Sequence, residues 1–312
     1  MLTNIRILTC ALIFASATLV IPGTSYAKTQ IPTRYQVGAA EKYDASAVQQ
    51  NYVALAGGLY NNALAAALTL SKTIDALKNA PTVATLDAAR AAWTSARNAY
   101  LETEAFRFYG GPIDGPKTEF RAAGPELLVN ANFLLLERAL WGSNNALIAQ
   151  LAAKGASSLR QGEAIASAAS SLQNDLAFVL KEWDPIRRTG YAQEFLQLEG
   201  TEAIRRILRG LGMQALALPK VKPSDARSNE LAAVLTGMHS IWHAQLNKIT
   251  APSIEALLVK MDPNAATAVS NALASAQTQA STNDPALPET LKNLALAIAN
   301  AGTSLGVAIA ID

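Results

Sequence analysis

Three charged side chains, Glu104, Arg107 and Asp114, surround the end of a long helical pattern. Glu104 and Arg107 are three positions apart, so one helical turn lets the carboxylate and the guanidinium pair. Gly110-Gly111-Pro112 then lets the backbone turn sharply, which places Asp114 to cap a helix or to coordinate a ligand. An ordinary surface pair is the alternative, but three aromatic residues between 106 and 109 indicate a packed helix end. We therefore predict that all three side chains line a ligand site.

A fourth candidate is Glu137, which lies in a run from 133 to 141 that is apolar apart from Arg138. A carboxylate in such surroundings is desolvated and needs a partner. If the group is structural, the partner is an arginine, either Arg107 or Arg138. If the group is functional, the partner is a metal ion or a polar ligand, and we predict Glu137 and Glu104 as the metal ligands.

The two histidines of the chain, His239 and His243, are four positions apart on one helical face. This spacing can chelate a metal ion. The pair is not the zinc-protease signature, because position 240 is Ser where the signature has a Glu base. No third ligand accompanies the pair in the motif, so we interpret both as partly exposed or packing residues.

The chain lacks the motifs of familiar catalytic sites. Its single cysteine is Cys10, and it has no Gly-x-Ser-x-Gly motif, no phosphate-binding glycine loop and no dinucleotide fingerprint. Lys and Arg number 26 against 24 Asp and Glu, without a basic stripe, which argues against a nucleic-acid partner. We therefore predict no catalytic residues and no nucleic-acid binding.

The first 27 residues have the pattern of a cleaved signal peptide. Arg6 precedes an apolar run from 7 to 21, and Ser25-Tyr26-Ala27 offers small residues for cleavage before Lys28. An uncleaved anchor is the alternative, but the run is short for a membrane span. We expect no membrane span after residue 27 and predict a soluble, periplasmic protein that folds by core packing without disulfides.

The elements that position these residues are predicted to be helices throughout. Ala, Leu, Gln, Lys and Glu dominate the long segments, and alternating β-rich runs are absent. We expect helices at 45–79, 85–108, 125–150, 158–183, 193–217, 225–248, 252–261, 264–280 and 284–309. The last two begin where Asp262-Pro263 and Asp284-Pro285 pair a capping side chain with a proline suited to a first helical turn.

Four antiparallel helices form a natural bundle, and the chain is long enough for two. We predict an all-α fold of two up-and-down, four-helix-bundle-like units, with a signal peptide over 1–27, an N-terminal bundle over 28–152 and a C-terminal bundle over 153–312. One long irregular bundle is the alternative. One face of the predicted helix 85–108 begins aromatic and ends charged, so we expect its charged end to meet a cavity or another domain.

Two of these runs resemble the imelysin family of bacterial envelope proteins. The family has a Thr-Glu-Ala-Phe-Arg-Phe-like run followed by Gly-Pro-Ile-Asp, and residues 103–108 and 111–114 match both closely. It then has Gly-x-His-x-x-Glu before an aromatic-Gly ending, with which Glu137 and 139–142 align. The family His falls on Leu134, and a leucine cannot ligate a metal.

The resemblance implies two four-helix-type bundles packed with a cleft between them, and a site in that cleft. A branch of the family without the histidine resembles this chain more, and it has a polar spot at the positions of Arg227 and Ser228. The site residues that follow are Glu104, Arg107, Asp114, Glu137, Arg227 and Ser228.

We expect a periplasmic protein that binds a divalent or ferric metal ion, a metal chelate or another small polar ligand without catalysis, in iron acquisition. The second hypothesis is a metal-dependent peptidase, because the family includes proteins labelled insulin-cleaving metallopeptidases. Hydrolytic zinc sites usually have three protein ligands. The leucine at 134 cannot serve as one of them, which argues against a peptidase. The third is an interaction protein whose cleft docks an envelope protein partner or a polysaccharide.

Overall fold

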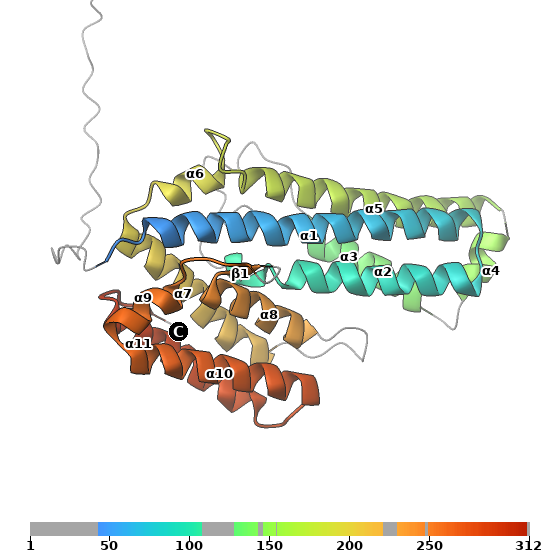
Figure 1. Ribbon diagram of the computed structural model, residues 1–312. Helices are drawn as coiled ribbons and strands as arrows, with labels where there is room; N and C mark the ends of the chain where they lie inside the picture. The colour runs from blue at the N-terminus through green and yellow to red at the C-terminus, as the bar shows by residue number, and fades with distance from the viewer. Residues whose placement is uncertain are drawn as a thin grey trace, which may run out of the picture. The chain divides into compact units, whose positions relative to one another are not determined.

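The computed structural model describes residues 43–107, 128–142, 146–153, 155–220, 230–246 and 249–310 (Figure 1). Helices make up most of this part of the chain, which confirms the all-α prediction. The predicted signal peptide lies outside the described residues.

The first group of helices contains α1 (Ser46–Asn79), α2 (Val83–Leu101), α3 (Val129–Trp141), α4 (Ala146–Ala152) and α5 (Ala156–Glu182). α1 packs along α2 and α5, and α3 packs on α5 and α2. Figure 1 shows α1 lying beside both α2 and α5. Apolar residues recur every three or four positions along α1, which buries the stripe Ala63, Ala67, Leu70, Ile74 and Leu77.

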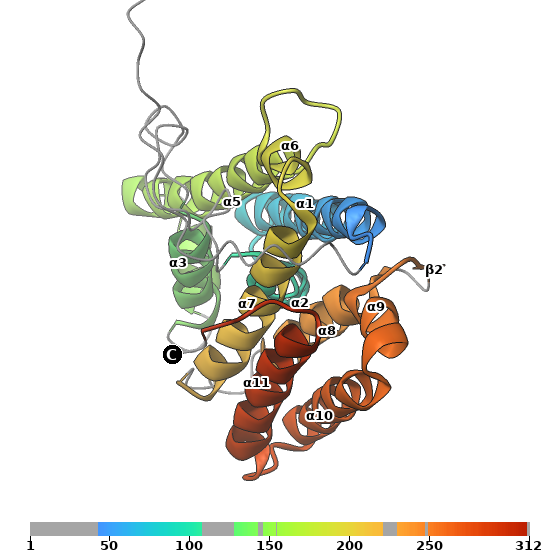
Figure 2. The ribbon, with the colours of Figure 1, turned by 90° about the vertical axis from the view of Figure 1, so that its left-hand side faces the viewer.

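The second group contains α7 (Gly200–Ala217), α8 (Glu230–His243), α9 (Ile254–Met261), α10 (Pro263–Thr282) and α11 (Leu287–Ser304). α11 packs on α10 and α7, and α10 also contacts α8 and α9 (Figure 2). Short elements η1 (Glu104–Phe106), α6 (Tyr191–Leu196) and η2 (Leu218–Lys220) complete the described helices.

The boundary predicted at 152–153 stays a prediction, and the contacts of the helix that follows it favour a later passage between the two groups. α5 follows that predicted boundary, yet it packs on α1 and α3 of the first group. Residues 41–312 form one compact unit. We therefore propose α6 as the passage from one group of helices to the other, within a single compact unit.

An aromatic cluster joins α1, η1 and α6 in the core. The ring of Tyr52 on α1 lies 4.9 Å from that of Phe106 on η1 and 4.9 Å from that of Phe195 on α6, measured between centroids. Trp183, just after α5, lies 6.0 Å from Tyr52 in an edge-on arrangement. These buried rings fix the end of α2 and η1 against the rest of the core.

Two predicted helices are interrupted for reasons that local sequence does not carry. The predicted helix 125–150 is two helices, α3 and α4. The predicted helix 193–217 is split into α6 and α7, and the Gln49 side-chain amide from α1 donates to the carbonyl oxygens of Phe195 (3.4 Å) and Leu198 (3.0 Å) at the break. Those bonds tie the break to α1, and the Phe195 carbonyl also accepts the backbone N–H of Leu198 at 3.2 Å.

The predicted helix 225–248 ends early, at His243, where Ala244 adopts a left-handed conformation with φ of 46°. A short antiparallel hairpin of β1 (Gln245–Leu246) and β2 (Ile249–Thr250) follows. Leu246 packs on α1 over Gly58, where a Cβ would overlap the leucine side chain. The glycine therefore makes room for the hairpin.

The predicted start of α10 is confirmed and that of α11 is corrected. Asp262 caps α10 by accepting the backbone N–H of Ala265 at 3.0 Å, and Pro263 occupies the first turn. α11 begins at Leu287 instead of 284, because the Asp284 carboxylate accepts the N–H of Ala286 at 2.8 Å in a turn before the helix.

The expectation that no segment after residue 27 could span a membrane needs correction. α1 is long and apolar enough to cross a membrane by length and composition alone. It packs along α2 and α5, however, and the core helix of a soluble protein passes the same test. Its packing therefore accounts for its apolar character.

Candidate functional site

The end of α2 holds the Glu104–Arg107 pair away from solvent. α2 stops at Leu101, and the buried Thr103 hydroxyl donates to the carbonyl of Tyr100 at 2.7 Å. Glu104 and Arg107 then form the predicted ion pair across η1, with side chains only 15% and 11% exposed. Arg107 also donates to the Tyr100 hydroxyl at 2.9 Å. This burial distinguishes the pair from an ordinary surface pair, as the neighbouring aromatic residues indicate.

A second buried ion pair involves Arg97, which lies earlier along the same face of α2. Arg97 donates through Nε to Glu230 of α8 at 3.1 Å and through Nη1 to Asn130 of α3 at 2.9 Å. The Arg97 and Glu230 side chains are 18% and 15% exposed. This face of α2 therefore contacts α8 of the second group of helices. The partner itself was missed, because it lies 133 residues further along the chain.

Two stacked rings connect these pairs. Tyr100 of α2 and Phe133 of α3 stack with centroids 5.6 Å apart. Arg97 lies 5.4 Å from the Phe133 ring and Arg107 lies 5.2 Å from the Tyr100 ring. Each guanidinium therefore has a carboxylate partner and an aromatic face, an arrangement that strengthens as water is excluded.

α2 and α5 together position α3, which carries Glu137. The Trp93 indole N–H donates to the Phe133 carbonyl at 3.0 Å, and Arg90 donates to the Leu140 carbonyl at 2.9 Å. At the other end, Asp175 of α5 accepts the N–H of Leu128 at 3.0 Å. Burial raises the pKa of Asp175, and this N–H bond acts in the opposite direction.

Glu137 is less enclosed than its sequence surroundings predict. Its side chain is half-buried, and Arg138 beside it is exposed. Leu134, which shares its helical face, is 45% exposed, and Leu135 is 43% exposed. The apolar run thus faces partly outward, so the carboxylate is less desolvated than the sequence predicts. The physical reason is that α3 buries only one side, through residues such as Phe133.

The metal-ligand roles of Glu104 and Glu137 stay predictions. In the part of the chain that the structure describes, no three His, Cys, Asp or Glu side chains are grouped so as to hold a metal ion. Asp114, Arg227 and Ser228 lie outside the described residues. The structure therefore brings Glu104 and Arg107 together, and the roles of the other predicted site residues stay predictions.

Glu102 is a carboxylate that the sequence reasoning missed. It lies between α2 and η1, half-buried, and burial raises its pKa above the ordinary value. α8 approaches closely there: a Cβ on Gly237 would overlap the Glu102 carbonyl oxygen. A glycine opposite a helix end is the signal of such an approach, but the sequence does not say which helix end it meets.

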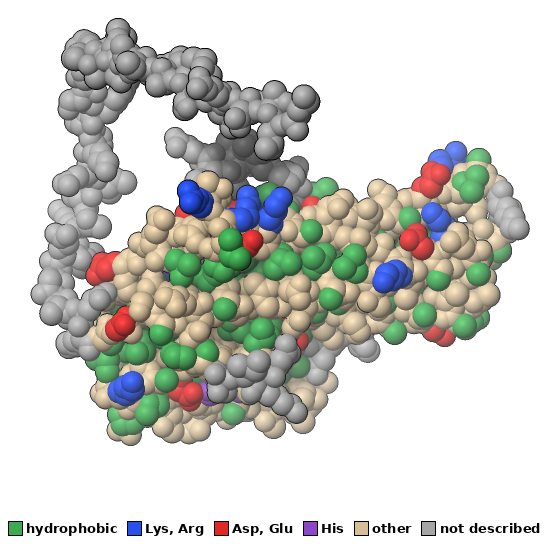
Figure 3. Space-filling model, turned by 45° about the horizontal axis from the view of Figure 1, so that its top comes forward, with side chains coloured by type: hydrophobic (Ala, Val, Ile, Leu, Met, Phe, Trp, Pro, Cys, Tyr) green, Lys and Arg blue, Asp and Glu red, His purple; other side chains and the backbone are tan. Residues whose placement is uncertain are grey.

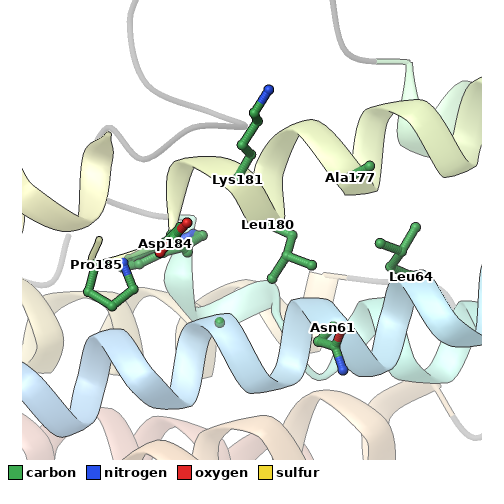
Figure 4. A pocket seen from close by; sticks show the side chains of 9 residues that line it. Asn61, Leu64, Ala177, Leu180, Lys181, Asp184 and Pro185 are labelled. Carbon is green, nitrogen blue, oxygen red and sulfur yellow. The ribbon is translucent and has the colours of Figure 1, made fainter. Parts of the chain in front are cut away.

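A separate groove lies on the first group of helices (Figure 4). It has a volume of about 520 Å³ between α1 and the end of α5, with Asn61, Leu64, Leu180 and Lys181 among its lining residues. Figure 3 shows hydrophobic side chains on the surface of the described helices. None of the predicted site residues lines this groove, and the cleft expected between the bundles stays a prediction.

The fold and the cluster at the end of α2 define an all-α protein of two packed helix groups with a buried polar junction. The chain belongs to the imelysin family, whose model, described as Imelysin and labelled Peptidase_M75, matches residues 57–127 and 133–302.

The crystal structure of a protein described as an iron-regulated protein A precursor from Parabacteroides distasonis ATCC 8503 has a similar fold. The TM-score is 0.55 and the sequence identity 14%, over 84% of this chain and 93% of that chain. At this identity the likeness concerns the fold alone. No curated protein matches the sequence.

Proposed function

We propose that this imelysin-family protein is an exported, periplasmic binding protein without catalytic activity. Its ligand is a metal ion, a metal chelate or another small polar molecule, bound at the cluster around the end of α2. A role in iron acquisition fits the family and the iron-regulated precursor that shares the fold. Export through a cleaved signal peptide over 1–27 is part of the proposal.

The observation that carries the proposal is the Glu102 carboxylate. Burial is the cause of its raised pKa, and no cation or hydrogen bond of the described residues lowers it. A half-buried carboxylate without compensation gains free energy when a cation or a hydrogen-bond donor binds it. Glu104 and Arg107, two and five residues on, add further polar groups to the same helix end.

Leu134 supports binding over hydrolysis. By its resemblance to the family motif, it stands where a metal-ligating histidine is expected, three residues before Glu137. A leucine there leaves the motif with a single carboxylate, whereas hydrolytic zinc sites usually have three protein ligands. A site with few protein ligands suits a metal ion that is already bound by other ligands, as in a metal chelate.

Iron loading tests the carboxylate site. The purified protein is incubated with ferric citrate, desalted and analysed for iron, as wild type, Glu102→Gln and Glu137→Gln. Ferric iron prefers hard oxygen ligands, so it reports on carboxylates more than on histidines. We expect the wild type to retain iron and Glu102→Gln to lose most of it. Equal iron in all three proteins, or none in the wild type, contradicts the proposal.

A gain of function tests the role of Leu134. Leu134→His restores a His-x-x-Glu spacing with Glu137, and in a His239→Gln/His243→Gln background we expect it to raise zinc retention at least about tenfold. Leu135→His is the matched control, because its side chain is equally exposed but has the wrong spacing. Peptide cleavage by the wild type that Glu137→Gln abolishes would instead favour a peptidase.

A further inference from the structure

The two histidines of the chain lie against each other on α8. The rings of His239 and His243 have centroids 4.3 Å apart and are tilted by 47°. Both residues are half-buried, and the His243 side chain is 24% exposed. Figure 3 shows histidine side chains (purple) at the molecular surface, so the imidazoles are reachable from solvent. The helical spacing therefore brings two imidazoles to one accessible place.

A carboxylate on another helix holds one of these rings in place. His243 Nδ1 lies 2.6 Å from Glu255 Oε2 of α9. The other oxygen, Glu255 Oε1, accepts the Ser270 hydroxyl of α10 at 2.7 Å. Ser270 in turn accepts the Trp242 indole N–H at 2.9 Å. Both oxygens of Glu255 are thus engaged, and the carboxylate has one orientation.

This arrangement selects one tautomer of His243. A carboxylate oxygen accepts a proton, so neutral His243 carries its hydrogen on Nδ1 and leaves the lone pair on Nε2. Carboxylates behind a ring in this way are common in metal sites, where they orient a ligating imidazole. At His239, burial and then the neighbouring His243 lower the pKa, while Glu255 opposes them. A neutral imidazole is the form that binds metals.

We propose that His239 and His243 form a two-histidine chelate for a divalent transition-metal ion of the Zn²⁺ or Cu²⁺ class, with Glu255 as a positioning residue. Imidazole nitrogens four residues apart on a helix suit these ions. No third side chain of the described residues joins them, so water completes the coordination. The site is separate from Glu102, Glu104 and Glu137, and it stands or falls independently of the proposed function.

The competing explanation is that these contacts only pack helices together. The chain from Trp242 through Ser270 to Glu255 joins α8, α9 and α10, which stabilises the second group whether or not a metal binds. That explanation predicts no zinc affinity. The two explanations therefore differ in one measurable quantity, the amount of zinc held by the histidines.

Zinc titration with a competing chromophoric chelator measures that quantity, on protein purified with a histidine-free tag. We expect one zinc ion per wild-type chain, and at least tenfold weaker binding in His239→Gln and in His243→Gln. Glu255→Gln should weaken binding about tenfold, as loss of an orienting carboxylate usually does. Glu289→Gln is the control, because it removes an exposed carboxylate on α11. Glu102→Gln and Glu137→Gln should bind zinc like the wild type.

Chemical protection gives a second readout that needs no variant. Diethyl pyrocarbonate modifies imidazoles, and His239 and His243 are the two histidines of the chain. We expect zinc to protect both from modification. The proposal is overturned if both histidines react equally with and without zinc, or if wild type and the double variant His239→Gln/His243→Gln bind zinc equally.

Discussion

The polar cluster around Arg97 and Arg107, at the end of α2, and the cluster around His243, at the end of α8, use their cations differently. In the first, each arginine has a buried carboxylate partner and an aromatic ring. An arginine is always charged, so such a pair holds helices together but cannot release its proton. In the second, Glu255 engages one nitrogen of a titratable ring. Residue type thus separates a cluster whose cations are permanently charged from a cluster whose rings can titrate.

The largest effect is expected where α8 meets the first cluster. Gly237→Ala puts a methyl group into the Glu102 carbonyl, so α8 must move away from α2. We expect a loss of about 3 kcal/mol in the free energy of unfolding, measured by denaturant titration.

Gly57→Ala is the matched control, because the nearest atom to its Cβ would be a carbonyl oxygen at 3.8 Å and the site is inside α1. It should leave the stability unchanged or raise it, as Gly to Ala does in a helix. Equal losses in both variants would contradict close packing at Gly237.

The second-largest loss of stability is expected when the permanent positive charge of Arg97 is removed. Arg97→Met leaves the Glu230 carboxylate half-enclosed without its cation, and we expect a loss of about 2 kcal/mol in the free energy of unfolding. His243→Gln, in the other cluster, should lose less, because the glutamine amide can still donate a hydrogen bond to Glu255, which also accepts the Ser270 hydroxyl. Adding Glu230→Gln to Arg97→Met should recover part of the loss. A double variant no better than Arg97→Met alone would mean that this carboxylate carries no penalty.

Lowering the pH should reduce the free energy of unfolding through the histidine cluster. Burial and His243 lower the folded-state pKa of His239 below its ordinary value of 6.5, so the unfolded chain binds protons more readily. Stability is therefore lost as pH falls through about 6.5, by under about 1 kcal/mol after screening by solvent. Thermal melts between pH 7.5 and 5.5 should show a smaller loss in His239→Gln than in the wild type. Parallel pH profiles would exclude this contribution.

The smallest effect is expected at Glu102. Its folded-state pKa is raised above its ordinary value of 4.5, so the folded protein binds protons more readily and loses stability as pH rises above 4.5. Glu102→Gln should therefore be more stable than the wild type at pH 7, by about 0.5 kcal/mol, with the difference vanishing below pH 4.5. A destabilised Glu102→Gln at pH 7 would show instead that the carboxylate has a favourable partner.

Local spacing was sufficient for the features that span a few residues. The helical pattern predicted a first helix over 45–79, and α1 covers Ser46–Asn79. The three-residue spacing predicted the Glu104–Arg107 pair, and Asp262-Pro263 predicted the start of α10. Each depends on groups within one or two turns, whose geometry a helix determines by itself.

Contacts between residues far apart in the sequence determined the features that local spacing did not predict. Gln49 bonds to the end of α6 about 150 positions away, Arg97 pairs with Glu230, and Glu255 orients His243 from a different helix. The sequence contains every one of these side chains, but their partners are chosen by how the helices pack. Hence the all-α fold and the chemically capable residues follow from the sequence, whereas only the packed structure decides which carboxylate meets which cation.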